Sequence, residues 1–426
     1  MLIRFEASNY RSIDDPVELS MVAIDRDREA AREEPLLGES LLPVAAVFGP
    51  NASGKSNIIA AFAWLRDAVQ HSLRTWDEEI PVEPFAFGTG PTAPSQFTVE
   101  STIDGVRFEY VLELDAAKVR YEGLFHYPEK KRRRIFEREG QELKLQRGLG
   151  KLSGTRELLT ERTLALSIAR RFDEPLVSDF SRTIVRTQTL GPVRRHGTAR
   201  NRDGRPPSTH QLRSTFRFFQ ESDQPSLFEE GAFPNVRSDS DRERALALLR
   251  LADLGIDDVV IDPGQTGLEP LSRRIRLVHR IADERASLEF AAESDGTRTW
   301  FHLIGPVLTA LHEGSLLLFD ELDASLHPTL SAQLVQLFHD PGTNPLGAQL
   351  VFTSHDTNLL NHLNRDEVWL TEKNSRGATR LGALAEFAGE RVRKSQNLET
   401  AYLHGRFGAL PQVDQADFLR SLGLIG

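Results

Sequence analysis

The sequence predicts an α/β fold in which a mostly parallel sheet is assembled from both ends of the chain. Near the start, an apolar run at residues 44–48 precedes the pattern Gly49-x-x-x-x-Gly54-Lys55-Ser56, and a segment with helical periodicity follows it. In the last third, apolar runs of strand length alternate with helical segments, which is typical of a parallel sheet. Between these regions, alternating apolar residues predict an antiparallel meander.

Length and composition are those of a soluble globular chain. The 426 residues are enough for two or three domains, or for one large domain with insertions, and 39% are hydrophobic and 27% charged. The net charge of −10 argues against a surface that binds nucleic acid throughout, and the absence of cysteine excludes disulfides and cysteine-ligated zinc. No apolar window is long enough to cross a bilayer and the N-terminus lacks a signal-peptide pattern, so we expect a cytoplasmic protein with no membrane partner.

The glycine-rich pattern predicts a phosphate-binding loop. Glycine lets the backbone curl until successive N–H groups point at phosphate oxygens, at the positive end of a helix dipole. Lys55 would contact the β- and γ-phosphates, and the Ser56 hydroxyl would hold Mg²⁺. The alternative is a glycine-rich turn without nucleotide, but the apolar spacing after the pattern favours a P-loop. The expected nucleotide-binding residues are Asn51, Ala52, Ser53, Gly54, Lys55, Ser56 and Asn57.

The remainder of the first 145 residues is predicted to be rich in strands. Asp104-Gly105 between two alternating runs predicts a β-hairpin, which begins a meander over residues 97–145. The expected strands cover residues 2–7, 97–103, 106–112, 119–127 and 134–137.

The middle of the chain is predicted to be helical and then irregular. Residues 156–187 have a helical pattern that Pro175 interrupts, and the Arg-, Gly- and Pro-rich residues 191–207 predict a mobile loop. A helix is expected at 241–254, with Ser240 or Asp241 as its cap. Further runs indicate strands that return towards the core, at residues 259–261, 275–281 and 288–290.

The last third carries an acidic pair at the end of a strand. Helices are expected at 297–312 and 328–338 and strands at 316–319 and 350–353. We expect the strand at 316–319 to lie beside the P-loop strand, so that Asp320 joins Ser56 at Mg²⁺ and Glu321 polarises the attacking water. Taken alone, such a pair is also typical of a helix cap.

Two further segments have candidate roles at the same crevice. His355 follows the strand at 350–353, where it would reach the γ-phosphate; the alternative is an ordinary loop residue. Residues 293–297, Glu-Ser-Asp-Gly-Thr, precede a helix, and small residues there predict an anion site, although a simple capped helix start has the same pattern.

These motifs and their order resemble those of ABC-type ATPases. The resemblance is greatest to the SMC-, RecF- and OLD-like branch, and within it to the AAA15 or abortive-infection ATPases called RloA or AbiLii-like. It rests on the P-loop, a large insertion, Ser294-Asp295-Gly296-Thr297, Phe319-Asp320-Glu321, residues 322–328 and Ser354-His355-Asp356. Residues 9–13 and 402–411 are similar to that family as well, whereas residues 118–239 match only loosely.

The resemblance implies a role for each matching residue. Ser294, Asp295 and Gly296 would form the signature that clamps the γ-phosphate of ATP bound to the opposite subunit. Asp323 would belong to the loop that crosses the dimer interface, and His355 would be the switch histidine. Arg11 and Ser12 would lie near the nucleotide, and Gln96 is the candidate for the glutamine linked to Mg²⁺. The signature departs from the Leu-Ser-Gly-Gly-Gln of transporters.

The resemblance also implies an architecture and a setting. The architecture is an ABC/SMC-like head with a split mixed sheet, an antiparallel β-meander and an inserted helical lobe; its halves would be residues 1–117 and 258–426, with the lobe at 118–257. The implied function is an ATPase that dimerises on ATP, with Mg²⁺, in bacterial anti-phage defence beside a separate nuclease or toxin effector. Too little chain follows His355 for a TOPRIM-type nuclease domain.

Other functions stay open from the sequence. A RecF-like DNA-repair head would share every motif and would bind DNA through the basic runs at residues 130–134 and 194–205, which are equally typical of solvated loops. A transporter subunit is disfavoured by the signature, and a non-hydrolysing sensor by the intact acidic pair. RNA binding and oligomers larger than a dimer are undetermined.

Overall fold

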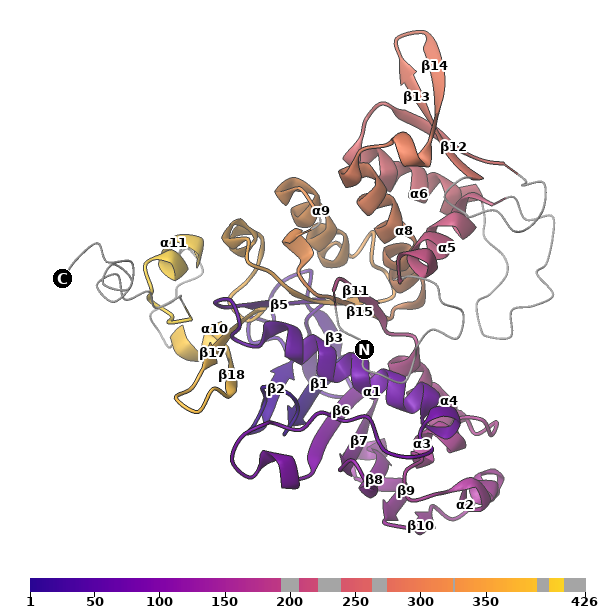
Figure 1. The fold of residues 1–426 in the computed structure, drawn as a ribbon, viewed down its shortest axis with the longest axis vertical. Coiled ribbons are helices and arrows are strands. Elements are labelled where there is room, and N and C mark those ends of the chain that lie inside the picture. The colour runs from indigo at the N-terminus through magenta and orange to yellow at the C-terminus, as the bar shows by residue number, and fades with distance from the viewer. Residues whose placement is uncertain (193–206, 221–238, 263–273, 325, 389–397, 410–426) are drawn as a thin grey trace.

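Two β-sheets with a long helix between them dominate the computed structural model (Figure 1). The structure describes residues 1–192, 207–220, 239–262, 274–324, 326–388 and 398–409. One sheet has seven strands in the order β10-β9-β8-β7-β6-β1-β2, and the other has six in the order β11-β15-β16-β5-β17-β18.

The seven-stranded sheet is the predicted meander joined to the first strand of the chain. All of its strand pairs are antiparallel. At the predicted hairpin, Asp104 and Gly105 have φ values of 48° and 75°, which is the backbone that an Asp-Gly turn between strands adopts. The strands are β1 (Leu2–Ser8), β2 (Val17–Ser20), β6 (Ser95–Ile103), β7 (Val106–Leu114), β8 (Val119–His126), β9 (Arg133–Glu139) and β10 (Glu142–Leu145).

The six-stranded sheet confirms that the nucleotide-binding sheet is split between distant parts of the chain. Its first five strands are parallel, and only β18 runs antiparallel to its neighbour. The strands are β5 (Val44–Phe48), β11 (Gln188–Leu190), β15 (Leu316–Phe319), β16 (Gln349–Thr353), β17 (Val368–Lys373) and β18 (Thr379–Ala383).

The expected neighbour of the P-loop strand is wrong. The acidic strand β15 does not lie beside β5, because β16 pairs with both and separates them. All five residues of β16 are buried, as a strand in the middle of a covered parallel sheet requires. An apolar run identifies such a buried strand but not its neighbours, which is why the order was missed.

Helix α1 (Lys55–Thr75) lies between the two sheets (Figure 1), and the six-stranded sheet separates two hydrophobic cores. On β5, Ala45 and Val47 face the core shared with α1 and the meander, whereas Val44, Ala46 and Phe48 face the opposite core. This alternation follows from the two-residue period of a strand. The second core contains α9 (Pro328–His339) and the helices around α8 (Asp295–Glu313).

The predicted helical segment at 156–187 forms three short helices, α2 (Thr155–Leu158), α3 (Ala165–Ala169) and α4 (Pro175–Val185). Pro175 begins α4, where proline needs no N–H partner. A fully buried ion pair, Glu122 with Arg138, fastens the meander to this segment, because Glu122 accepts the N–H groups of Ala165 and Leu166 at 2.6 and 2.7 Å.

Two further helices, α5 (Pro207–Phe219) and α6 (Asp239–Ala252), pack against α8. Helix α6 begins at Asp239, so the expected cap at Ser240 or Asp241 is wrong and both residues lie in its first turn. The chain also contains α10 (Leu384–Ala388), α11 (Leu398–Leu403) and the two-stranded sheet of β3 (Arg32–Glu34) and β4 (Glu39–Leu41).

The strands expected to return towards the core form a separate antiparallel sheet of β12 (Ile256–Ile261), β13 (Ile275–Ile281) and β14 (Glu284–Glu289), and the buried apolar residues of β12 and β13 join the second core. The sheet projects beyond the helices (Figure 1). The buried residues of β12 and β13 are Ile256, Val259, Ile275 and Leu277, whereas every residue of β14 is exposed. Of the expected domain boundaries, residue 117 lies in the turn between β7 and β8 of the meander, and residue 257 lies within β12.

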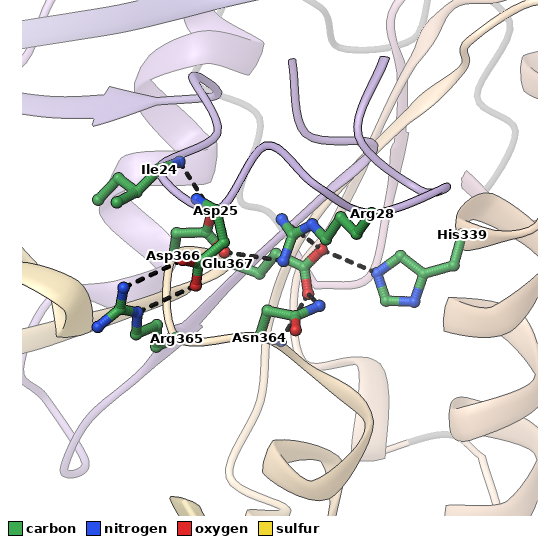
Figure 2. A network of polar contacts seen from close by, with 8 residues as sticks. All are labelled: Ile24, Asp25, Arg28, His339, Asn364, Arg365, Asp366 and Glu367. Carbon is green, nitrogen blue, oxygen red and sulfur yellow. Dashed lines mark hydrogen bonds and ion pairs between the residues drawn. The ribbon is translucent and has the colours of Figure 1, made fainter. Parts of the chain in front are cut away.

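A network of charged residues fastens the polar segment after β2 to the residues just before β17 (Figure 2). These residues lie at the end of the six-stranded sheet opposite the P-loop. Arg28 lies 3.0 Å from Asp366 and 3.3 Å from Glu367, and the His339 ring lies 3.1 Å from Glu367. Burial acts to raise the pKa of Glu367, but His339 and Arg28 outweigh it and the pKa is below its ordinary value. Ion pairs therefore stabilise this end of the sheet.

The expected mobile loop at 191–207 and the basic run at 194–205 lie almost entirely outside the described residues. Among the helices that the structure describes, none is long and apolar enough to span a membrane.

Candidate functional site

The P-loop connects β5 to α1 through two glycines that cannot be replaced without steric conflict. Gly49 has φ 150° and Gly54 has φ 106°, which side chains disfavour. A Cβ on Gly49 would overlap with Thr371, and a Cβ on Gly54 would overlap with Thr379. The loop therefore packs directly against strands β17 and β18 on one side and leaves Asn51 and Ala52 exposed on the other.

Lys55 lies at the start of α1 and curls back over the loop. Its ammonium is buried and donates to the carbonyl oxygens of Gly49 and Pro50 at 2.8 and 3.1 Å. Burial lowers the pKa of Lys55 to about 8, although the carboxylates of Asp323, Asp320 and Glu321 act in the opposite direction. The acidic pair expected beside the P-loop, and Asp323, which was expected in the loop at the dimer interface, are therefore electrostatically coupled to its lysine.

The acidic pair is positioned by Thr353, the last residue of the intervening strand β16. The Thr353 hydroxyl donates to Asp320 Oδ1 at 2.8 Å and accepts the Glu321 N–H at 2.8 Å. Asp320 is buried, whereas Glu321 is partly exposed and has the left-handed φ of 55°. A non-glycine residue in this conformation is strained, so the turn that aims Glu321 is held by its surroundings.

His355 and Asp323 meet at the same edge. The backbone N–H of His355 donates to Asp323 Oδ1 at 3.0 Å, and the imidazole is exposed. Burial and the nearby Lys55 lower the pKa of His355, and the carboxylates of Asp323, Glu321 and Asp320 oppose them. The lowered pKa favours the neutral form of the ring.

Ser12 reaches the P-loop helix, whereas the Arg11 side chain pairs with Glu83. Asn57 donates to Ser12 Oγ at 2.6 Å, and Ser12 Oγ lies 2.8 Å from Thr379 Oγ1. The Arg11 side chain pairs with Glu83 at 3.0 Å and lies over the ring of Tyr10.

Gln96 lies on β6 and its amide donates to Glu113 of the meander at 3.3 Å. Within the part of the chain that is described, no hydrogen bond links Gln96 to the P-loop or the acidic pair. The structure therefore gives no support to Gln96 as a residue near Mg²⁺.

The signature residues lie at the N-terminus of α8, and all three are exposed. Ser294 is the N-cap: its Oγ accepts the Thr297 N–H at 3.1 Å, and Asp295 pairs with Arg298. A Cβ on Gly296 would meet only Ser294 Oγ at 3.8 Å, so nothing in the described chain requires glycine there. Among the hydrogen bonds and ion pairs described, none joins these residues to the P-loop of the same chain.

The buried Glu293 precedes Ser294 and links the signature to the projecting sheet. His279 on β13 lies 2.8 Å from Glu293 Oε1. The sequence offered no signal for this contact, since the two residues belong to different elements.

A cavity of about 560 Å³ opens beside the P-loop. Its lining includes Asn51 and Ser53 of the loop, His355, Lys373 at the end of β17, and Tyr402 on α11. Lys373, Thr371 and Thr379 were missed by the sequence analysis, because no motif marks a hydroxyl or an amine at a strand end.

The site residues suit a Mg²⁺–nucleotide. The glycines let the P-loop pack against β17 and β18 while its other side stays exposed, and the Ser56 hydroxyl and the Asp320 carboxylate are oxygen ligands of the kind that Mg²⁺ takes. No group of three or more metal-binding side chains occurs among the described residues.

Fold and motif order together define a P-loop NTPase of the ABC/SMC-like class, with its phosphate loop on a split parallel sheet and its signature on a separate helix. Residues 44–361 match the family described as "AAA domain, putative AbiEii toxin, Type IV TA system", and the chain belongs to that family. The narrower AAA15 assignment stays a prediction.

Solved structures of SMC heads are similar to this chain. The SMC head domain from Thermotoga maritima has a TM-score of 0.41 at 12% identity, covering 90% of this chain and 98% of that one. An SmcHead bound to the C-winged helix domain of ScpA has a TM-score of 0.44 at 11% identity with the same coverage. A Pyrococcus furiosus Smc head with an extended coiled coil has a TM-score of 0.38 at 12% identity, covering 95% and 98%. No curated protein matches the chain.

Proposed function

We propose that this chain is an ATPase whose active form is a homodimer that encloses two ATP molecules. The observation that carries the proposal is the division of the site. Lys55, Asp320, Glu321, Asp323 and His355 are electrostatically coupled in one chain, whereas Ser294, Asp295 and Gly296 are exposed elsewhere on it. A second copy could therefore supply its signature to each P-loop, as a two-fold symmetric contact requires.

Each residue has a defined task in the proposed reaction. Glu321 is exposed enough to accept a proton from an attacking water, and its carboxylate is aimed by the turn that Thr353 holds. Lys55 and the α1 N-terminus stabilise negative charge on the phosphates, and a ring N–H of His355 donates a hydrogen bond to the γ-phosphate. Mg²⁺ held by Ser56 and Asp320 would neutralise phosphate charge.

We further propose that the ATPase acts as a regulator in anti-phage defence and works with a separate nuclease or toxin. The family description, which includes a toxin–antitoxin system, supports a defence setting. Co-purification of the chain with the product of an adjacent gene, in the presence and absence of ATP, would identify the effector.

The DNA-repair alternative has less support. Three arginines of the basic run at 130–134 are paired with carboxylates, namely Arg132 with Glu109, Arg133 with Glu129 and Arg134 with Glu137. These pairs leave less free positive charge for phosphates. ATP-dependent DNA binding with a steep salt dependence would favour that alternative.

The decisive experiment traps the dimer. In Glu321→Gln the amide cannot accept the proton, so hydrolysis should fall by at least about 100-fold while ATP binding persists. Light scattering after gel filtration should detect a dimer with ATP and a monomer with ADP. Glu289→Gln on the exposed β14 is the matched control and should behave like the unaltered chain. A Glu321→Gln variant that stays monomeric with ATP, or hydrolyses normally, would refute the model.

A further inference from the structure

Strand β17 presents one face to the P-loop, and two residues of that face lie at its end. Thr371 Oγ1 lies 2.6 Å from Ser53 Oγ and donates to the Phe48 carbonyl at 3.2 Å. Side chains two positions apart share a face of a strand, so Lys373 follows Thr371 on the side of the P-loop. Glu372, between them, faces away and accepts the N–H of Ala409.

Lys373 lines the cavity that also contains Asn51 of the loop and His355. The side chain is exposed, yet the protein around it still lowers the pKa of Lys373 by desolvation. Within the described chain, no hydrogen bond or ion pair holds its ammonium. The three N–H donors of this ammonium are therefore available to an anion in the cavity.

The C-terminal segment braces the two elements that carry Lys373 and His355. On α11, Glu399 accepts from Thr357 at 3.2 Å and from Asn361 at 2.7 Å, both in the turn directly after His355. Tyr402 of the same helix lines the cavity and donates to the Ala409 carbonyl at 2.9 Å, next to the bond between Ala409 and Glu372. These contacts hold the residue next to Lys373 and the turn that follows His355.

We propose that Lys373 is a second cation for the terminal phosphate of bound ATP. Lys55 approaches from the base of the loop, and Lys373 approaches from the cavity side, beside Asn51 and His355. The inference rests on the proposed nucleotide site. It makes Lys373 a determinant of the preference for nucleoside triphosphate over diphosphate, because ADP lacks the group that the lysine contacts.

The test compares Lys373→Met with Lys373→Arg and with the control Lys118→Met, an exposed lysine in the turn between β7 and β8. All are made in the Glu321→Gln background, and Kd is measured for ATP and for ADP by competition with a fluorescent nucleotide. Lys373→Met should weaken ATP binding by about tenfold, as expected for one lost charge-assisted contact, and leave ADP binding within about twofold. Lys373→Arg should retain most ATP affinity.

The outcomes separate this inference from the proposed function. If the Glu321→Gln parent binds no ATP, the proposed function fails and Lys373 has no triphosphate to contact. If the parent binds ATP but Lys373→Met matches Lys118→Met, or weakens ATP and ADP equally, the nucleotide site stands and the role of Lys373 is refuted. Unchanged thermal unfolding of Lys373→Met would show that the difference is not a folding defect.

Discussion

At Lys55, burial and charge act in opposite directions on the same ammonium. Desolvation lowers its pKa to about 8 against the pull of three carboxylates, so the lysine loses its charge within an accessible pH range. A bound triphosphate would raise that pKa by adding negative charge. Proton binding and nucleotide binding at this residue are therefore linked.

This linkage predicts the pH dependence of ATP binding. Below pH 8, free Lys55 is charged and affinity should be constant; above pH 8 it must gain a proton to bind, so Kd should rise about tenfold per pH unit until the pKa of the complex is reached. The measurement is Kd for ATP from pH 7 to 9.5 in the Glu321→Gln background. Lys373→Met should retain the dependence, and a flat profile would contradict the assigned pKa.

Hydroxyl groups organise the rest of the site at the residue scale. Thr353 holds the acidic turn, Thr371 holds Ser53, and Thr379 donates to the Ser53 carbonyl at 2.8 Å. Thr353 directly precedes the Ser354-His355-Asp356 motif, whereas Thr371 and Thr379 belong to no motif of the sequence. Threonine at a strand end has many uses, so only the contact partner identifies the role.

At the scale of elements, α8 connects the predicted signature to the acidic strand β15. It runs from the cap at Ser294 to Glu313, and β15 begins three residues later, at Leu316. Helix α5 crosses it closely at Gly305, beside Pro306. The Thr215 hydroxyl of α5 accepts the Gly305 N–H at 2.8 Å and donates to the Phe301 carbonyl at 2.7 Å, and so replaces a helical hydrogen bond.

This crossing predicts that a Cβ lowers the stability of the protein at one glycine of α8 and not at another. A Cβ on Gly305 would overlap with the backbone of Ser214 and Thr215, so Gly305→Ala should reduce the free energy of unfolding by about 1–3 kcal/mol. Gly296→Ala, where space is open, is the matched control for stability and should cause no loss. Urea unfolding of both variants measures the difference, and equal stabilities would contradict the close crossing.

At the scale of the whole molecule, the proposed function requires two chains for each reaction. One variant, Lys55→Ala, would keep its signature but lose its P-loop lysine, and another, Ser294→Arg, would keep its P-loop but block its signature. Each alone should hydrolyse little ATP. An equal mixture should regain about a quarter of the normal rate, because half of the dimers are mixed and each contains one intact site. A mixture no more active than its components would contradict the shared site.

The arrangement of the sheets was predictable only in part. The meander and the split sheet followed from patterning, since alternation and apolar runs depend on residues close in the chain. The position of β16 between β15 and β5 did not follow, because buried parallel strands have similar compositions. The strands β12, β13 and β14 were expected to return towards the core, and the few apolar residues of β12 and β13 do join it, but the pattern does not show that they form a sheet of their own.

The sequence by itself determined the local chemistry of this protein. The glycines, Lys55 and Ser56 form a strand–turn–helix unit whose shape depends on neighbours in the chain, and Asp320, Glu321 and His355 follow buried strands whose ends meet at one sheet edge. Only the tertiary structure decided what supports that site. Ser53 meets Thr371 across 318 positions and Ser12 meets Thr379 across 367, and Lys373 shares a cavity with Asn51. Such contacts depend on strand order and register, which no local pattern encodes.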